Sequence, residues 1–145
     1  MNGADHLCDT LIAHGVDVCF ANPGTSEMHF VAALDRKPQM RCILGLFEGV
    51  VTGAADGYAR MTGKPAFVYG QRGPGVANLA GALADPLWAR SPVISLTSSI
   101  HLSSRDRFEY QDVDGLPLHV GVTKWNKINA SNQWLKYVSF CRLAS

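Results

Sequence analysis

Hydrophobic positions in the first hundred residues alternate between two periodicities. Residues 4–14 place their apolar side chains on one stripe with helical spacing, formed by Leu7, Cys8, Leu11 and Ile12. Gly15 follows as a helix stop. The next segment, "VDVCFA" (16–21), is short and rich in β-branched residues. The pattern therefore predicts a helix followed by a strand.

The same succession repeats along the chain. The turn "NPGT" (22–25) leads into a helix that we expect to reach about Leu34, with Thr25 or Ser26 as its N-cap. Glu27 lies near the positive end of that helix. Further strands are predicted at 41–47 (buried), 66–70 and 92–99, and further helices at 48–61 and 76–90. Pro86 should kink the last helix or end its first half.

Alternating strands and helices with short connections predict an α/β fold, a doubly wound and mostly parallel sheet with helices on both faces. Ligands of such sheets gather at the carboxyl ends of the strands. Three features fall there: Asn22–Ser26, Glu48 and Gln71–Asn78. After Ser99 the alternation fades, with one helical turn expected near 110–116.

Composition narrows the classes of function. The 145 residues suit one domain, charged residues make up 17%, and the net charge is +1. The sequence has no block of Lys and Arg residues, so it does not predict nucleic-acid binding. It also has no apolar run of the kind that predicts a membrane span or a signal peptide. Cysteines at 8, 19, 42 and 141 are interpreted as buried free thiols of a cytoplasmic protein, with a disulfide framework as the alternative.

Glycine-rich segments invite a nucleotide interpretation that the spacing does not support. "GYARMTGKP" (57–65) has five residues between its glycines where a phosphate loop needs four, and "GPGVAN" (73–78) has Asn78 where the dinucleotide motif needs glycine. The histidines are dispersed, so we predict no metal site.

Glu48 opens the segment "LFEGVVTGAADGYAR" (46–60) after a predicted strand. A carboxylate at that place is desolvated unless it is paired, which suits acid–base chemistry. Its position alone favours an ordinary helix-start acid, stabilised by the helix dipole.

Small residues recur at spacings of three and four in the helix after Glu48, at Gly49, Gly53, Ala54 and Gly57. Each glycine costs a helix about 1 kcal/mol relative to alanine, so this bare face should pack closely against a neighbour. The neighbour is either a helix of the same domain or the mate in a symmetric dimer.

Together, "GVDVCFANPGTSE", "LFEGVVTGAADGYAR", "QRGPGVANLAGAL" and "PVISLTS" resemble the N-terminal pyrimidine-binding domain of thiamine diphosphate enzymes of the acetolactate synthase, benzoylformate decarboxylase and pyruvate oxidase type. The resemblance runs from residue 1 to about 128. "EYQDVDGLPLHVGVTKWNK" resembles the acetolactate synthase branch, which implies decarboxylation and carboligation of 2-oxo acids in branched-chain amino acid biosynthesis.

The resemblance implies roles for single residues. The matching Glu48 hydrogen-bonds N1′ of the cofactor's aminopyrimidine and favours its imino tautomer, whose nitrogen takes the proton from thiazolium C2. The residues that match the turn and loop beside the cofactor are Pro23, Gly24, Thr25, Gln71, Gly73, Pro74, Gly75 and Asn78. Ser26 and Gln111 match positions on the substrate side, and the face of Gly49, Gly53, Ala54 and Gly57 matches a homodimer interface. The pair Gln71–Arg72 departs from the usual residues, which leaves the substrate open.

The resemblance also implies a second domain that binds diphosphate through magnesium with a Gly-Asp-Gly motif, which this sequence lacks. We therefore expect a pyrimidine-binding domain at 1–130, a divergent, truncated tail at 131–145, and no activity from the chain alone. FAD, which some synthases carry, is not assigned. A subunit of a split 2-oxo acid decarboxylase and a non-catalytic interaction module of the same fold remain alternatives.

Overall fold

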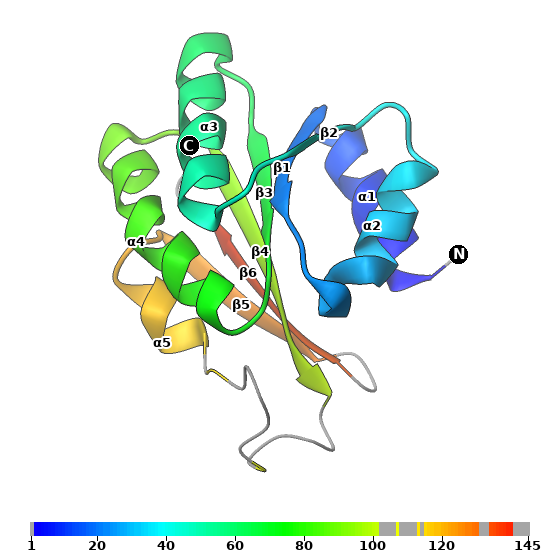
Figure 1. The fold of residues 1–145 in the computed structure, drawn as a ribbon. Helices are drawn as coiled ribbons and strands as arrows, with labels where there is room; N and C mark the ends of the chain where they lie inside the picture. The colour runs from blue at the N-terminus through cyan, green and yellow to red at the C-terminus, as the bar shows by residue number, and fades with distance from the viewer. Residues whose placement is uncertain (1, 102–106, 108–112, 114, 131–133, 141–145) are drawn as a thin grey trace.

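A six-stranded sheet forms the centre of the computed structural model, which describes residues 2–101, 107, 113, 115–130 and 134–140 (Figure 1). The strand order is β2-β1-β3-β4-β6-β5. The first four in that order pair in parallel: β1 (Val18–Asn22), β2 (Arg41–Leu44), β3 (Ala66–Gly70) and β4 (Val93–His101). β6 (Trp134–Phe140) pairs antiparallel with both β4 and β5 (Trp125–Ala130). The predicted mostly parallel α/β sheet is confirmed.

Helices cover both faces of the sheet (Figure 1). One face carries α1 (Gly3–Ala13), the short 3-10 helix η1 (Thr25–Glu27) and α2 (Met28–Asp35). The other face carries α3 (Glu48–Thr62) and α4 (Pro74–Ala89), and α5 (Gly115–Val120) packs against α4. Each central strand supplies alternate side chains to two separate cores, so Phe67 packs toward α1 and α2 while Val68 packs toward α3 and α4.

Local sequence explains where the helices that frame the site begin and end. Asn2 and Asp5 form a capping box at the start of α1. α3 begins at Glu48 directly after the extended residue Phe47 and ends at Gly63, whose φ of 69° lies in the left-handed region. The helix predicted over 48–61 is therefore confirmed.

The predicted buried strand at 41–47 is wrong in length and in burial. Only Arg41–Leu44 are in a strand, and three of its four residues are exposed. β2 lies at the edge of the sheet and has one neighbour, β1. An apolar run in a sequence does not distinguish an edge strand from a central one. Cys42 is accordingly exposed, whereas Cys8 and Cys19 are buried free thiols as predicted and Cys141 lies outside the described residues.

Two expectations about helices also need correction. α4 continues through Pro86 to Ala89, so Pro86 does not end the helix, and the kink stays a prediction. The helical turn expected near 110–116 occurs at Gly115–Val120 as α5.

β6 lies in the segment that showed no resemblance to the expected family. Its backbone pairs with β4 from Ile94 to His101, with a shift of register after Ser98. Residues 134–140 therefore belong to the same sheet, and the domain boundary at residue 130 stays a prediction.

Candidate functional site

Glu48 is buried where three elements meet. It is the first residue of α3, and only 4% of its surface is exposed. Its Cγ lies 3.4 Å from the place where a Cβ on Gly70, the last residue of β3, would stand. The carboxylate therefore lies at the carboxyl end of the sheet, where the fold predicts a ligand site.

Asn78 fixes one oxygen of this carboxylate. Its side-chain Nδ2 donates a hydrogen bond of 2.9 Å to Glu48 Oε2. A carboxylate accepts hydrogen bonds, which identifies the amide nitrogen as the donor. Asn78 is the fifth residue of α4, so this bond joins the start of α3 to α4.

Gly75 leaves room for the other oxygen. A Cβ at Gly75 would stand 2.6 Å from Glu48 Oε1, closer than real contacts allow. Among the residues that the structure describes, Oε1 has no hydrogen-bonding partner. The preceding Gly73 has a φ of +68°, which favours glycine, and Pro74 then begins α4. Glu48 Oε1 therefore lies over the backbone of Gly75, where no side chain covers it.

The turn after β1 lies against this loop. The Gln71 side chain covers Gly24, because a Cβ on Gly24 would stand 2.9 Å from Gln71 Cδ. The Gln71 backbone N–H donates to the Asn22 carbonyl at 3.0 Å. β1 and β3 are neighbours in the sheet, so their carboxyl ends bring the two loops side by side.

Glu27 is a site residue that the sequence analysis did not assign. Its Oε2 accepts from the Gly24 N–H at 2.9 Å, and its Oε1 accepts from the Arg72 N–H at 3.1 Å. Only 1% of Glu27 is exposed. One buried carboxylate thus holds both site loops. The signal was its position three residues after Gly24, the spacing of a capping box.

The N-cap expected from Thr25 or Ser26 is wrong. These residues form η1 with Glu27, and neither η1 nor α2 has a side-chain hydrogen bond from its N-cap residue. The Glu27 carboxylate bonds the Gly24 backbone in place of a hydroxyl cap.

Two buried polar side chains support the site from opposite faces of the sheet. The Tyr69 hydroxyl lies 3.4 Å from the Glu27 carbonyl and 3.3 Å from Ser98 Oγ, and burial raises the pKa of Tyr69 well above its usual value. On the other face, His119 Nε2 lies 3.2 Å from the Val76 carbonyl. Burial lowers the pKa of His119, and the neutral ring can donate to that carbonyl. α5 is thereby joined to the first turn of α4.

The small-residue face of α3 points outward. Gly53, Ala54 and Gly57 are exposed, and no atom lies within 4 Å of a Cβ built on either glycine. Gly49 differs, because its Cβ would stand 2.6 Å from the Phe47 ring. Packing among the described residues therefore explains Gly49 and leaves the glycines at 53 and 57 unexplained.

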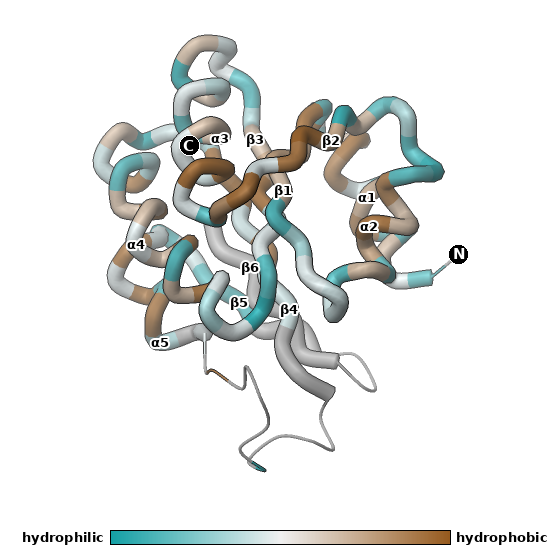
Figure 2. Tube along the Cα trace, viewed as in Figure 1, coloured by the Kyte–Doolittle hydropathy of each residue, from teal (hydrophilic) through white to brown (hydrophobic). Residues whose placement is uncertain are grey.

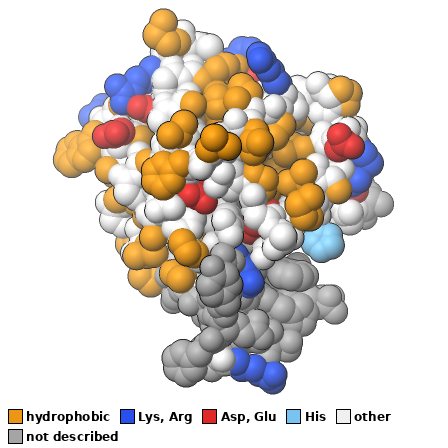
Figure 3. Space-filling model, viewed as in Figure 1, with side chains coloured by type: hydrophobic (Ala, Val, Ile, Leu, Met, Phe, Trp, Pro, Cys, Tyr) orange, Lys and Arg blue, Asp and Glu red, His pale blue; other side chains and the backbone are white. Residues whose placement is uncertain are grey.

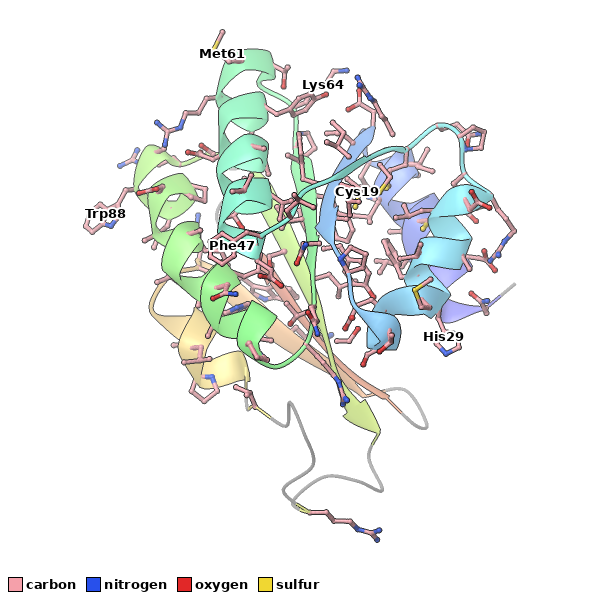
Figure 4. All side chains as sticks on the ribbon, in the orientation of Figure 1. Cys19, His29, Phe47, Met61, Lys64 and Trp88 are labelled. Carbon is pink, nitrogen blue, oxygen red and sulfur yellow. The ribbon has the colours of Figure 1, made fainter. Side chains whose placement is uncertain are left out.

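Apolar side chains surround that face. Most of the trace from β2 to the first turn of α3 has the colour of hydrophobic residues (Figure 2), and hydrophobic side chains gather over these elements (Figure 3). The exposed ones are Leu44, Leu46, Phe47, Val50 and Met61. Met61 points away from the molecule at the far end of α3 (Figure 4).

Most of the predicted site residues lie in three adjacent segments. Contacts bring together Gly24, Glu48, Gln71, Gly75 and Asn78. Pro23, Thr25, Ser26, Gly73 and Pro74 lie in the same turns. Gln111 lies outside the described residues. Within the described part of the chain, no group of three metal-binding side chains occurs, and no helix is long and apolar enough to cross a membrane.

Comparison with known proteins identifies a family for this chain. The family described as thiamine pyrophosphate enzyme, N-terminal TPP binding domain, matches residues 1–118. IlvX of Mycobacterium tuberculosis, provisionally named an acetolactate synthase large subunit, is 62% identical over 94 residues, which cover 65% of this chain and 18% of that protein. Acetolactate synthase 2 of Brassica napus is 36% identical over 125 residues, which cover 86% of this chain and 20% of that protein.

The fold is similar to that of a solved thiamine diphosphate-dependent enzyme. The thiamine diphosphate-dependent 4-hydroxybenzoylformate decarboxylase of Rhodococcus jostii RHA1 superposes with a TM-score of 0.78 at 28% identity, over 86% of this chain and 24% of that one. The chain spans about a fifth of the length of the curated relatives it matches.

Proposed function

Because this chain belongs to the thiamine pyrophosphate enzymes through their N-terminal TPP binding domain, we propose that it is the pyrimidine-binding half of an enzyme that acts on 2-oxo acids. The observation that carries the proposal is the buried Glu48 carboxylate, held by Asn78 on one oxygen and open over Gly75 on the other. The similarity to acetolactate synthases and to a benzoylformate-type decarboxylase supports a 2-oxo acid as the substrate.

The residues present fit an aminopyrimidine. Such a ring needs a partner for a ring nitrogen and a surface that it can approach closely. Glu48 Oε1 meets the first need, and the space that a Cβ on Gly75 would fill meets the second. Gln71 borders the same space and Gly24 lies against Gln71, so these two residues are the neighbouring candidates to contact the ring.

Each residue has a separate task in this proposal. Thiamine diphosphate, when bound, supplies the thiazolium carbon at which the carbon–carbon bond of a 2-oxo acid is broken or formed. Glu48 holds a proton between Oε1 and the ring nitrogen N1′. Asn78 keeps the carboxylate from rotating, and Glu27 keeps the two site loops in register through Gly24 and Arg72.

Binding of magnesium and of the cofactor's diphosphate needs a second domain or chain. We place magnesium and the diphosphate on a Gly-Asp-Gly domain or subunit, because this sequence contains no such motif. The outward face of Gly53, Ala54 and Gly57, with Val50 and Met61 beside it, is the surface that we propose for a second chain of this family. FAD is not assigned.

A diphosphate-binding domain of a relative, added to this chain, allows a direct test. Deuterium exchange at thiazolium C2 should be fast with the native chain and nearly abolished by Glu48→Gln, which keeps the shape but not the proton-holding carboxylate. Exchange that is unaffected by Glu48→Gln would remove Glu48 from the mechanism. Titration calorimetry of the chain alone with thiamine diphosphate and magnesium should show no tight binding, and micromolar binding would contradict a divided site.

A non-catalytic module of the same fold is the second candidate. The exposed apolar face on α3 favours it, because such a face can occupy the interface of a full-length subunit. The two candidates differ in the exchange assay. A module would associate with its partner without restoring any exchange that depends on Glu48.

A further inference from the structure

Cys19 and Cys42 are direct partners in neighbouring strands. They lie opposite each other in the parallel register of β1 and β2. Register partners in a parallel sheet point to the same face, and Cys19 belongs to the core under α1 and α2. Figure 4 shows Cys19 on that side of β1. Strands about 4.8 Å apart place two Cα atoms within the range of about 4.4–6.8 Å that a disulfide spans.

The two thiols differ in their access to solvent. Cys19 is fully buried, whereas Cys42 is exposed on the four-residue edge strand. A dissolved oxidant therefore reaches Cys42 first. Among the described residues β2 has only β1 as a neighbour in the sheet, so it can adjust as the two sulfur atoms come within bonding distance.

The chemistry of Cys42 matches its position. A hydrogen bond from the Cys19 thiol lowers the pKa of Cys42 to about 7, although burial opposes the shift. The same bond and burial raise the pKa of Cys19 well above its usual value, with Cys42 and Cys8 adding to the effect. Among the described ionisable groups, only cysteine thiols shift the pKa values of Cys19 and Cys42.

We propose that Cys42 is a peroxide-reactive modification site and that Cys19 is its resolving thiol, so that oxidation joins the two in a reversible disulfide across β1 and β2. An exposed thiolate beside a second thiol is the arrangement of redox-sensitive cysteines. The proposal is independent of the thiamine diphosphate site.

The oxidation has two balanced steps. The Cys42 thiolate attacks one oxygen of hydrogen peroxide, the O–O bond breaks, and the departing hydroxide takes a proton to become water. Cys42 is thereby oxidised by two electrons to a sulfenic acid. The Cys19 sulfur then attacks Cys42 Sγ, the S–O bond breaks, and the leaving hydroxide takes the Cys19 proton. Two thiols and one peroxide yield one disulfide and two waters.

Peptide mapping tests the linkage. The reduced chain would be treated with equimolar hydrogen peroxide, alkylated, and digested with trypsin and a protease that cleaves before aspartate, because Asp9 and Asp17 separate Cys8 from Cys19. We expect a Cys19–Cys42 cross-link that dithiothreitol removes and that Cys8→Ser retains. A dominant cross-link of Cys42 to Cys8 or Cys141, or no cross-link at all, would overturn the proposal.

The pH dependence of alkylation tests the role of Cys19 before oxidation. A lower pKa also lowers the intrinsic nucleophilicity of a thiolate, so the midpoint of the pH profile is a better readout than the rate at one pH. The Cys42 midpoint should lie near pH 7 and should rise by about one unit or more in Cys19→Ala, which has no donor. Cys19→Ser keeps a hydroxyl donor, should stay below Cys19→Ala, and also serves if the alanine variant does not fold. A midpoint that is equal in all three chains would exclude Cys19 as the donor.

Discussion

Asn78 and Glu48 are thirty positions apart in the sequence, and the amide of the first donates a 2.9 Å hydrogen bond to the carboxylate of the second. The bond joins two helices at the carboxyl end of the sheet and leaves Oε1 directed over Gly75. The hydrogen bond fixes the orientation of the Glu48 carboxylate, whereas an ordinary acid at the start of a helix would be free to rotate.

Asn78→Leu should slow the C2 proton exchange that depends on Glu48, although Glu48 itself is still present. Loss of a hydrogen bond to a charged group costs about 1.5–3 kcal/mol, so C2 exchange in the reconstituted enzyme should fall by roughly ten- to a hundredfold. If Asn78 acts through Glu48, the double variant with Glu48→Gln should be no slower than Glu48→Gln alone. Additive losses would assign Asn78 a separate role.

Gly75→Ala should displace the Glu48 carboxylate, because the new methyl group would stand 2.6 Å from Oε1. We expect exchange to fall and the free energy of unfolding to drop by about 1–3 kcal/mol, as for other overpacked sites. Gly53→Ala is the matched control, since its Cβ meets no atom within 4 Å and alanine favours a helix by up to about 1 kcal/mol. Urea unfolding at a fixed protein concentration measures both, and equal stabilities of the two variants would contradict the crowding at Gly75.

Glu27→Gln should destabilise the two site loops. A carboxylate accepts from both Gly24 and Arg72, whereas an amide offers only one oxygen and leaves one backbone N–H unpaired. The expected cost is about 1–3 kcal/mol in the free energy of unfolding. Hydrogen exchange should quicken at whichever of the two amides loses its acceptor. Protection that is unchanged at both would show that the loops are held by other contacts.

His119 should make the chain less stable in mild acid. Its pKa in the folded chain lies below the value of about 6.5 expected after unfolding, so the unfolded chain binds the extra proton first. The stability that His119 contributes is complete above about pH 6.5 and falls as the pH drops from there toward the folded pKa. Between pH 7.5 and 5.5, His119→Gln should therefore lose less unfolding free energy than the native chain. Urea unfolding at both pH values measures this, and equal losses in the two chains would contradict it.

Ala54→Arg should prevent self-association. Ala54 is exposed between Gly53 and Gly57 on the outward stripe of α3, and an arginine there would place charge in an apolar contact. Light scattering should show an oligomer for the native chain and a monomer for the variant. Gln39→Arg adds the same charge at an exposed position outside this stripe and should remain associated. A native chain that is monomeric would contradict the proposed surface.

Local sequence predicted the elements that frame the site. The bounds of β3 and of α3 follow from a short apolar run and from a helical pattern closed by a glycine. The location of Glu48 at the start of α3 was predicted for the same reason. These features depend on residues within a few positions of each other, and backbone preferences and hydrophobic periodicity act over that range.

Only the tertiary structure decided which elements are neighbours. It placed β2 at the sheet edge, where Cys42 is exposed, and it added β6 beside β4. It paired Asn78 with Glu48 and gave Glu27 its partner in Arg72, forty-five positions away. Such contacts join segments that are distant in sequence, and no local pattern encodes the distance between them. The sequence by itself determined that a carboxylate begins the helix after β2, and the packing of α3 against α4 decided that this carboxylate is buried, held and open on one side.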